Sequence, residues 1–179
     1  MALSATVYNF DVELSDVDRN VYDTLALRVA CHPSEAREHL VARVLARCLE
    51  HAEGIAFSRG LAEPDEPALH VRDLTGALRA WIEVGLPDAA RLHRASKAAP
   101  RVAVYAHKEP RVWLRALGEA RIHRADALEL YALDRALVAA LAERLERRTR
   151  WGVAVTDGHL YVTVDGATLD GAVERLAPG

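Results

Sequence analysis

Residues 101–106 (RVAVYA) restrict the fold more than any other segment, because a run that is almost entirely apolar is typical of a strand buried on both faces. A helix is predicted over about 88–98 and a strand over 77–84, with Gly85 and Pro87 between them. Strand, helix and strand at 77–106 therefore predict a βαβ crossover, in which the two strands run parallel. The fold class that follows is α/β.

The rest of the chain predicts more strands and helices around this crossover. Alternating apolar residues predict a hairpin of 3–14 and 21–30. A helix from Ser34, as N-cap, to about His51 follows, with Glu35 in its first turn. Further predictions are strands at 55–58, 68–73 and 128–132, helices at 110–117 and after Asp134, and a hairpin around Asp157-Gly158.

Length and composition indicate one globular domain over residues 1–179. The net charge of −3 argues against a general nucleic-acid-binding surface, although a local basic patch is compatible with it. Cys31 and Cys48 lie in apolar stretches and are interpreted as buried thiols, which favours a reducing compartment. Without a signal peptide or membrane-spanning run, we expect a cytoplasmic protein with no membrane partner. Protein partners and oligomeric state stay open.

Carboxylates around the crossover are the main candidates for chemistry, because phosphate-binding loops, nucleophile elbows and paired metal-ligand histidines are absent from the sequence. Glu83 lies near the carboxyl end of a core strand, where open α/β sheets bind ligands. Pairing 68–73 with 77–84 places His70 opposite Trp81 and Arg72 opposite Arg79. It also puts Glu66 on the face of Glu83. A solvated strand-end glutamate is the ordinary alternative for Glu83.

Two carboxylates at one strand end can hold Mg²⁺, which would polarise a phosphodiester. Glu66 is as easily a solvated loop acid, and Asp73, on the opposite face, is better explained as a turn residue. Glu35 is a third candidate ligand, although the helix dipole alone favours an acid there. The crossover helix supplies cations, each of which is ordinarily a solvated charge: Arg91, Arg94 and Lys97.

Several stretches resemble the YaeQ family of bacterial proteins over essentially the whole chain. They are MALSATVYNF at the start, HPSE at 32–35, FSRGL at 57–61, DEP at 65–67, RDLTG at 72–76, WIEVGLPD at 81–88 and RVAVYAH at 101–107. The combination of RDLTG with WIEVG-x-PD is the most specific part of the resemblance.

The resemblance implies a compact variant of the PD-(D/E)XK nuclease-like fold, with a mixed central sheet and flanking helices. It implies Mg²⁺ ligands at Glu35, Glu83 and a middle acid, either Glu66 or Asp73, of which the strand register favours Glu66. The sequence departs from E-x-K, because Gly85 stands where these nucleases carry lysine. A cation from the following helix would replace it, either Arg94 or Lys97, and arginine cannot serve as a base.

Two functions follow as expectations. The first is a Mg²⁺-dependent phosphodiesterase acting on nucleic acid, with Glu83, Arg94 and Lys97 at the reacting phosphate. The second is a nuclease-fold module that no longer cuts and serves as a binding or regulatory protein. The missing lysine and the acidic net charge favour the second, and the clustered carboxylates favour the first. In a third hypothesis the acids are only structural charges on the surface. The fold alone does not decide among the three hypotheses.

Overall fold

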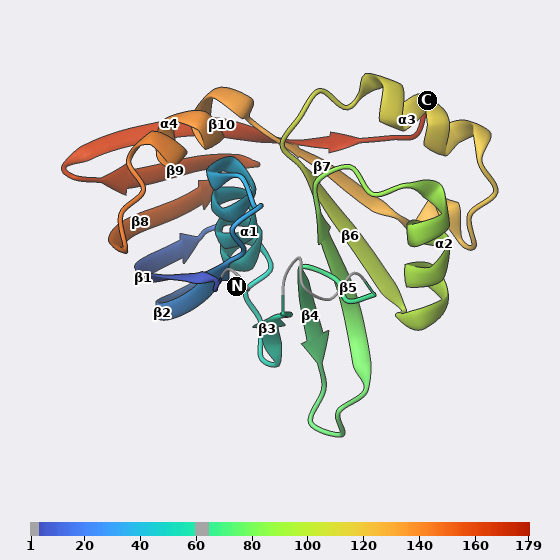
Figure 1. The fold of residues 1–179 in the computed structure, drawn as a ribbon, viewed down its shortest axis with the longest axis horizontal. Coiled ribbons are helices and arrows are strands. Elements are labelled where there is room, and N and C mark those ends of the chain that lie inside the picture. Colours follow the sequence, from blue (N-terminus) through green and yellow to red (C-terminus); the bar gives the residue numbers. More distant parts are fainter. Residues whose placement is uncertain (1–3, 60–64) are drawn as a thin grey trace.

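The computed structural model describes residues 4–59 and 65–179. In these residues ten strands form one mixed sheet (Figure 1). The strands are β1 Thr6–Asp16, β2 Val21–Cys31, β3 Ile55–Phe57, β4 Leu69–Arg72, β5 Leu78–Val84, β6 Arg101–Ala106, β7 Glu129–Leu133, β8 Arg148–Thr156, β9 His159–Val164 and β10 Ala167–Leu176. The α-helices are α1 Arg37–Leu49, α2 Ala89–Ala98, α3 Arg111–Glu119 and α4 Arg135–Glu143.

The sheet bends so strongly that its two halves face each other across α1 (Figure 1). The strand order is β2-β1-β8-β9-β10-β7-β6-β5-β4-β3. Strand β10 belongs to both halves, because residues 167–172 pair with β9 and residues 173–176 pair with β7. Gly171 allows α4 to pack directly on this strand, since a Cβ there would lie 2.5 Å from the Cβ of Asp134.

The predicted crossover is confirmed, because β5 and β6 pair in parallel and α2 connects them. The N-terminal hairpin of β1 and β2 and the hairpin of β8 and β9 are also confirmed. Asp157 and Gly158 both have positive φ, as a tight two-residue turn of this hand requires. Asp134 caps α4 as expected, with its side chain accepting a hydrogen bond from the amide of Leu137.

Two predictions about local structure were wrong, and one strand was missed. Helix α1 begins at Arg37, its N-cap Ala36 makes no side-chain bond, and Ser34 instead bonds to the ring of His32. Glu35 therefore precedes the helix. A bulge after Val71 shifts the hairpin, so that Arg72 pairs with Leu78 and not with Arg79. Strand β10 was not predicted at all.

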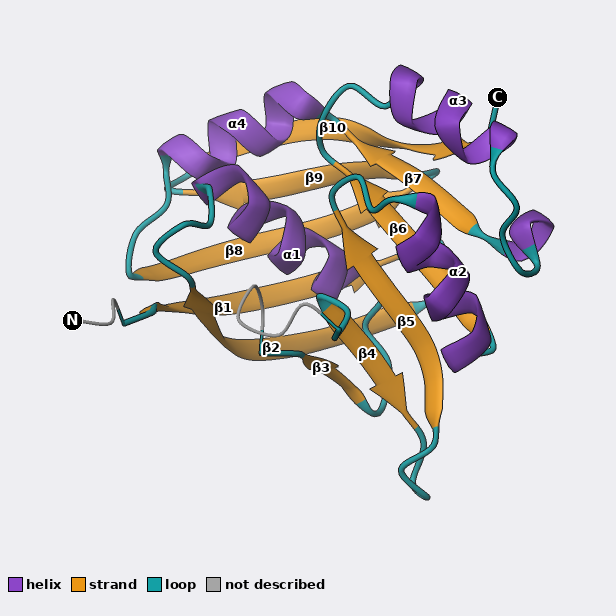
Figure 2. Cartoon of the chain, turned by 45° about the vertical axis from the view of Figure 1, so that its right-hand side comes forward, coloured by secondary structure: helices purple, strands orange, loops and turns teal. Residues whose placement is uncertain are grey.

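Strands β5 and β6 are buried on both faces, and α1 and α2 lie on opposite sides of them (Figure 2). Ile82 and Val84 belong to the apolar core that includes α1 and α4. Trp81 and Val104 belong to a second core with Leu92 of α2 and residues of α3. This two-sided burial explains why RVAVYA contains almost no polar residue.

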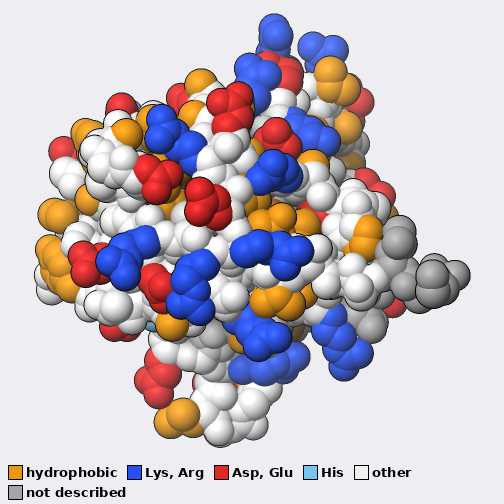
Figure 3. All heavy atoms as spheres, turned by 60° about the vertical axis from the view of Figure 1, so that its left-hand side comes forward, with side chains coloured by type: hydrophobic (Ala, Val, Ile, Leu, Met, Phe, Trp, Pro, Cys, Tyr) orange, Lys and Arg blue, Asp and Glu red, His pale blue; other side chains and the backbone are white. Residues whose placement is uncertain are grey.

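The other half of the sheet follows the alternation of a one-sided sheet. Seen from the side of β1, β2, β8 and β9, positive and negative side chains are interspersed over the surface (Figure 3). Along β2, every second residue from Leu25 to Cys31 is buried and those between are exposed. None of the helices in the described ranges has the length and apolar character needed to cross a membrane.

Candidate functional site

Glu83 lies one residue from the carboxyl end of β5, on the face covered by α2. Its side chain is only 7% exposed. The indole nitrogen of Trp81 donates to Oε1 at 2.6 Å, and Nε of Arg91 donates to the same oxygen at 2.9 Å. Burial raises the pKa of Glu83, and the bonds from Arg91 and Trp81 offset this effect only in part. Glu83 is therefore a buried carboxylate with a guanidinium already bound.

Arg91 connects Glu83 to the segment that contains Glu66. Its Nη2 donates to the backbone oxygen of Glu66 at 2.6 Å, and its guanidinium lies 5.9 Å from the ring centre of Trp81. Asp88 fixes the start of α2 by accepting from the amide of Arg91. The cation that the helix brings to Glu83 is thus Arg91, which the sequence identified only as one of three candidates.

Arg94 and Lys97, which the sequence favoured for the phosphate, are both exposed on α2. The helix buries Leu92, Ala95 and Ser96 against the sheet. Because a helix turns 100° per residue, positions 94 and 97 lie on its outer surface, away from this buried face. They do not reach the Glu83 carboxylate in this arrangement, but they are available to a large ligand.

Glu35 lies just before α1 and is even more buried, with 1% of its side chain exposed. Arg43 binds both of its oxygens, with Nε at 2.8 Å and Nη2 at 2.7 Å. Nδ1 of His39 lies 2.6 Å from Oε2. Burial alone would raise the pKa of Glu35, but the bonds from His39 and Arg43 outweigh it, so the pKa lies below its usual value.

His39 lies between the two buried acids. An ionised carboxylate only accepts, so Nδ1 must carry the proton that it shares with Glu35. Its Nε2 lies 3.4 Å from the backbone oxygen of Val84, the residue after Glu83. The ring of His107 lies 5.6 Å away, and burial lowers the pKa of that histidine to about 4. The α1 side of the strand end thus carries a carboxylate–histidine pair next to a neutral imidazole.

The two candidates for the middle acid lie at different ends of the hairpin. Glu66 precedes β4, and its carboxylate accepts from the amide of Arg59 at 3.3 Å. Asp73 occupies the turn after β4 and accepts from the amides of Thr75 and Ala77. The strand between that turn and Glu83 is roughly 20 Å long at 3.3 Å per residue. The structure therefore brings Glu66, and not Asp73, toward Glu83.

The buried acids fit a metal site poorly as they are arranged. Among the described residues, no three His, Cys, Asp or Glu side chains gather in a way that could hold a metal ion. Both oxygens of Glu35 are bound by Arg43, and the Oε1 of Glu83 is bound by Trp81 and Arg91. The ligand set expected from the sequence would need these charge-assisted bonds to break.

We predict that the free energy of unfolding of Glu83→Gln, compared with that of the wild type at the same pH, becomes more favourable to the variant as pH increases. A carboxyl whose pKa is raised by folding contributes stability below its unfolded pKa and loses that contribution as pH rises through the folded pKa. The neutral amide has no such loss. Urea unfolding from about pH 4 to about pH 8 should show a difference that grows with pH. A difference of constant size would contradict the raised pKa.

Comparisons with known proteins agree with the sequence motifs. A family model described as YaeQ protein matches residues 1–173. The uncharacterized protein YaeQ of Salmonella typhi is 33% identical over 165 residues, covering 91% of each chain. That of Escherichia coli K12 is 31% identical over 172 residues, covering 95% of this chain and 94% of that one.

Two solved structures are similar over nearly the whole chain. The crystal structure of YaeQ protein from Pseudomonas syringae has a TM-score of 0.87 and 33% identity, covering 97% of this chain and 96% of that one. The YaeQ protein from Xanthomonas axonopodis pv. citri has a TM-score of 0.86 and 31% identity, covering 98% and 100%.

Proposed function

The chain belongs to the YaeQ family, and we propose that it is a nuclease-like module that binds nucleic acid without cutting it by a metal-dependent reaction. The observation that carries this proposal is that Glu35 and Glu83, the two buried acids of the expected ligand set, are each paired with an arginine. Arg43 forms an ion pair with Glu35 and Arg91 forms one with Glu83, with N–O distances of 2.7 and 2.9 Å. Carboxylates that are already bound by arginine are less available to a metal ion, and the surface cations remain to meet a polyanion.

The distribution of charge supports nucleic acid as the partner. Residues 88–126 contain nine Lys and Arg against four Asp and Glu. Two of the nine, Arg91 and Arg101, are paired in the structure with glutamates outside this segment. Arg94 and Lys97 are exposed on α2. Arg124 donates to the backbone oxygens of Ser96 and Ala99, so its segment lies against the end of the same helix. Exposed cations on one helix surface are the kind of group that contacts phosphates.

The second candidate function is the Mg²⁺-dependent phosphodiesterase. One observation favours it: Arg91 links the carboxylate of Glu83 to the backbone of Glu66, so two acids of the expected set lie at one strand end. Glu66 is more exposed than the other acids, with 38% of its side chain accessible. Metal binding there would require Glu83 to exchange its bond with Arg91 for a bond with the ion.

We predict that the double variant Arg94→Glu/Lys97→Glu binds nucleic acid at least about tenfold more weakly than the wild type near 50 mM salt. Each lost phosphate contact should also lower the salt dependence of log K by about one. Fluorescence anisotropy with labelled single-stranded and double-stranded DNA and RNA measures both effects.

The matched control is Arg28→Glu/Arg150→Glu, which makes the same change of charge on exposed positions of β2 and β8. Equal loss of affinity in both double variants would refute the α2 surface as the binding site. The same assay with millimolar Mg²⁺ or Mn²⁺ tests the second candidate. Cleavage that requires metal and disappears in Glu83→Gln would replace the binding proposal with the phosphodiesterase.

A further inference from the structure

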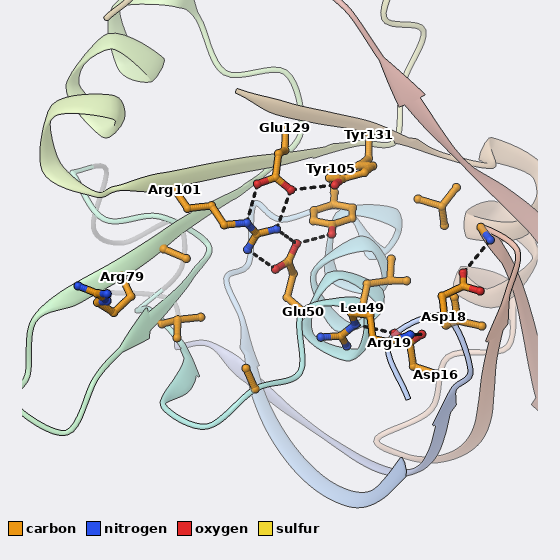
Figure 4. Close-up of a pocket in the computed structure, with 16 residues that line it drawn as sticks. Asp16, Asp18, Arg19, Leu49, Glu50, Arg79, Arg101, Tyr105, Glu129 and Tyr131 are labelled. Atoms are coloured by element: carbon orange, nitrogen blue, oxygen red, sulfur yellow. Dashed lines mark hydrogen bonds and ion pairs between the residues drawn. The ribbon is translucent and has the colours of Figure 1, made fainter. Parts of the chain in front are cut away.

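A cavity of about 590 Å³ lies at the opposite end of α1 from Glu35 (Figure 4). It opens where the two halves of the sheet meet, at the amino ends of β6 and β7. Its volume is in the range of small-molecule sites. Four carboxylates and three guanidinium groups line it: Asp16, Asp18, Glu50, Glu129, Arg19, Arg79 and Arg101.

Arg101 stands in one wall between two carboxylates (Figure 4). Its Nε and Nη2 donate to the two oxygens of Glu129 at 2.6 and 3.0 Å. Its Nη1 and Nη2 donate to the two oxygens of Glu50 at 2.6 and 3.0 Å. A guanidinium has five N–H donors, and four bonds are made here. Arg101 therefore has little capacity left for an anion.

The two carboxylates on Arg101 still have acceptor capacity. Tyr105 donates to Oε1 of Glu50, and Tyr131 donates to Oε1 of Glu129 at 2.9 Å. Each glutamate thus accepts three bonds of about four that a carboxylate can take. In this wall two carboxylates share Arg101. Arg175 approaches Glu129 from an exposed position at 3.9 Å, and Arg79, also in the lining, is 62% exposed and pairs with Asp73 at 3.9 Å.

The facing wall shows the same imbalance between donors and acceptors. Asp18 accepts from the backbone amides of Asp157 and Gly158 at 2.7 and 2.8 Å, so its oxygens have further capacity. Arg19 donates to Asp16 and to two backbone oxygens at the end of α1. Those oxygens form the negative end of the helix dipole. Figure 4 shows Asp18 across the cavity from Glu50 and Glu129.

The lining also includes apolar side chains, namely Leu49, Val71, Val155 and Val173. Leu49 lies between Glu50 and Asp18 (Figure 4). The cavity thus presents carboxylates with some acceptor capacity left on two sides, together with apolar side chains. A ligand that matches must donate hydrogen bonds at both ends and carry positive charge there, with a hydrocarbon segment in the middle.

We propose that this cavity binds an aliphatic diamine or polyamine, with one ammonium group at Glu50 and Glu129 and another at Asp18. Ammonium groups are three-fold donors without acceptors, which complements carboxylates that have acceptor capacity left. A monoamine would satisfy only one wall. An inorganic anion would meet Arg19 and Arg101, whose donors are mostly in use, and Arg79, whose side chain is 62% exposed and pairs with Asp73 at 3.9 Å.

Calorimetric titration of the full chain with 1,4-diaminobutane and spermidine tests this proposal, with butylamine and inorganic phosphate as comparison probes. Saturable binding of the diamine should be at least about tenfold tighter than that of the monoamine, because two charge-assisted contacts replace one. Glu129→Gln should weaken diamine binding about tenfold. Glu13→Gln, which removes the same charge from an exposed position on β1, should leave it unchanged.

Val173→Phe provides an independent variant, since it fills the cavity and leaves every carboxylate in place. It should abolish diamine binding while the unfolding midpoint shows that the chain remains folded. The proposal is overturned if butylamine binds as well as the diamine, if Glu129→Gln and Glu13→Gln behave alike, or if phosphate binds and competes with the diamine.

Discussion

Replacing Arg43 with methionine is expected to lower the free energy of unfolding by about 3–5 kcal/mol. Arg43 is 2% exposed and binds both oxygens of Glu35, whose side chain is 1% exposed. Removing the guanidinium leaves the buried carboxylate with the ring of His39 as its hydrogen-bond partner. Such an uncompensated charge costs far more than the intact pair contributes, because the carboxylate is not rehydrated. Denaturant unfolding at neutral pH measures the loss.

The double variant Glu35→Gln/Arg43→Met separates charge from packing. It removes both charges, so we expect it to recover most of the stability that Arg43→Met loses. Lowering the pH should also restore part of the stability of the single variant, because protonation of Glu35 removes the unpaired charge. If the single and double variants were equally unstable across pH, the ion pair would not be the cause.

Trp151→Ala is expected to cost a similar amount, about 3–5 kcal/mol, for a different reason. Trp151 is 1% exposed on the inner face of β8, and its ring meets Phe10 of β1 edge to face at 5.0 Å. Truncation removes the buried ring and leaves a cavity under α1 and α4 that the rigid sheet cannot close. Thermal or denaturant unfolding at one pH suffices to measure it.

Tyr161→Ala is the matched control on the neighbouring strand. Its ring faces outward from β9 and is 42% exposed, so its removal should change stability by no more than about 0.5 kcal/mol. A large effect of Tyr161→Ala, or a small effect of Trp151→Ala, would show that the inner and outer faces of this half of the sheet are assigned wrongly.

Segments with strong local signals were the ones that could be predicted. RVAVYA, the Asp157-Gly158 turn and the Asp134 cap each encode their structure in neighbouring residues, and each prediction is confirmed. Strand β10 lacks such a signal. Its first half pairs with β9 and its second half with β7, so the faces it buries change along its length and no single alternation results.

The candidate site was predictable only as a set of residue types. The alternation of β5 placed Glu83 correctly at the strand end, and the pairing of His70 with Trp81 is confirmed. The choice among Arg91, Arg94 and Lys97 depended on how α2 is rotated on the sheet, which local spacing does not specify. The pairing of Glu35 with Arg43 could not be predicted from the sequence either, because Arg43 lies eight residues away on the buried face of α1.

By itself, the sequence determined the α/β class, the crossover that makes β5 and β6 parallel, and the acids present at the strand end. Only the tertiary structure decided that each buried acid is bound by an arginine, and that a cavity between acidic walls opens where the two halves of the sheet meet. Periodicity and turn residues act within a few positions of the chain, whereas these contacts join segments brought together by packing.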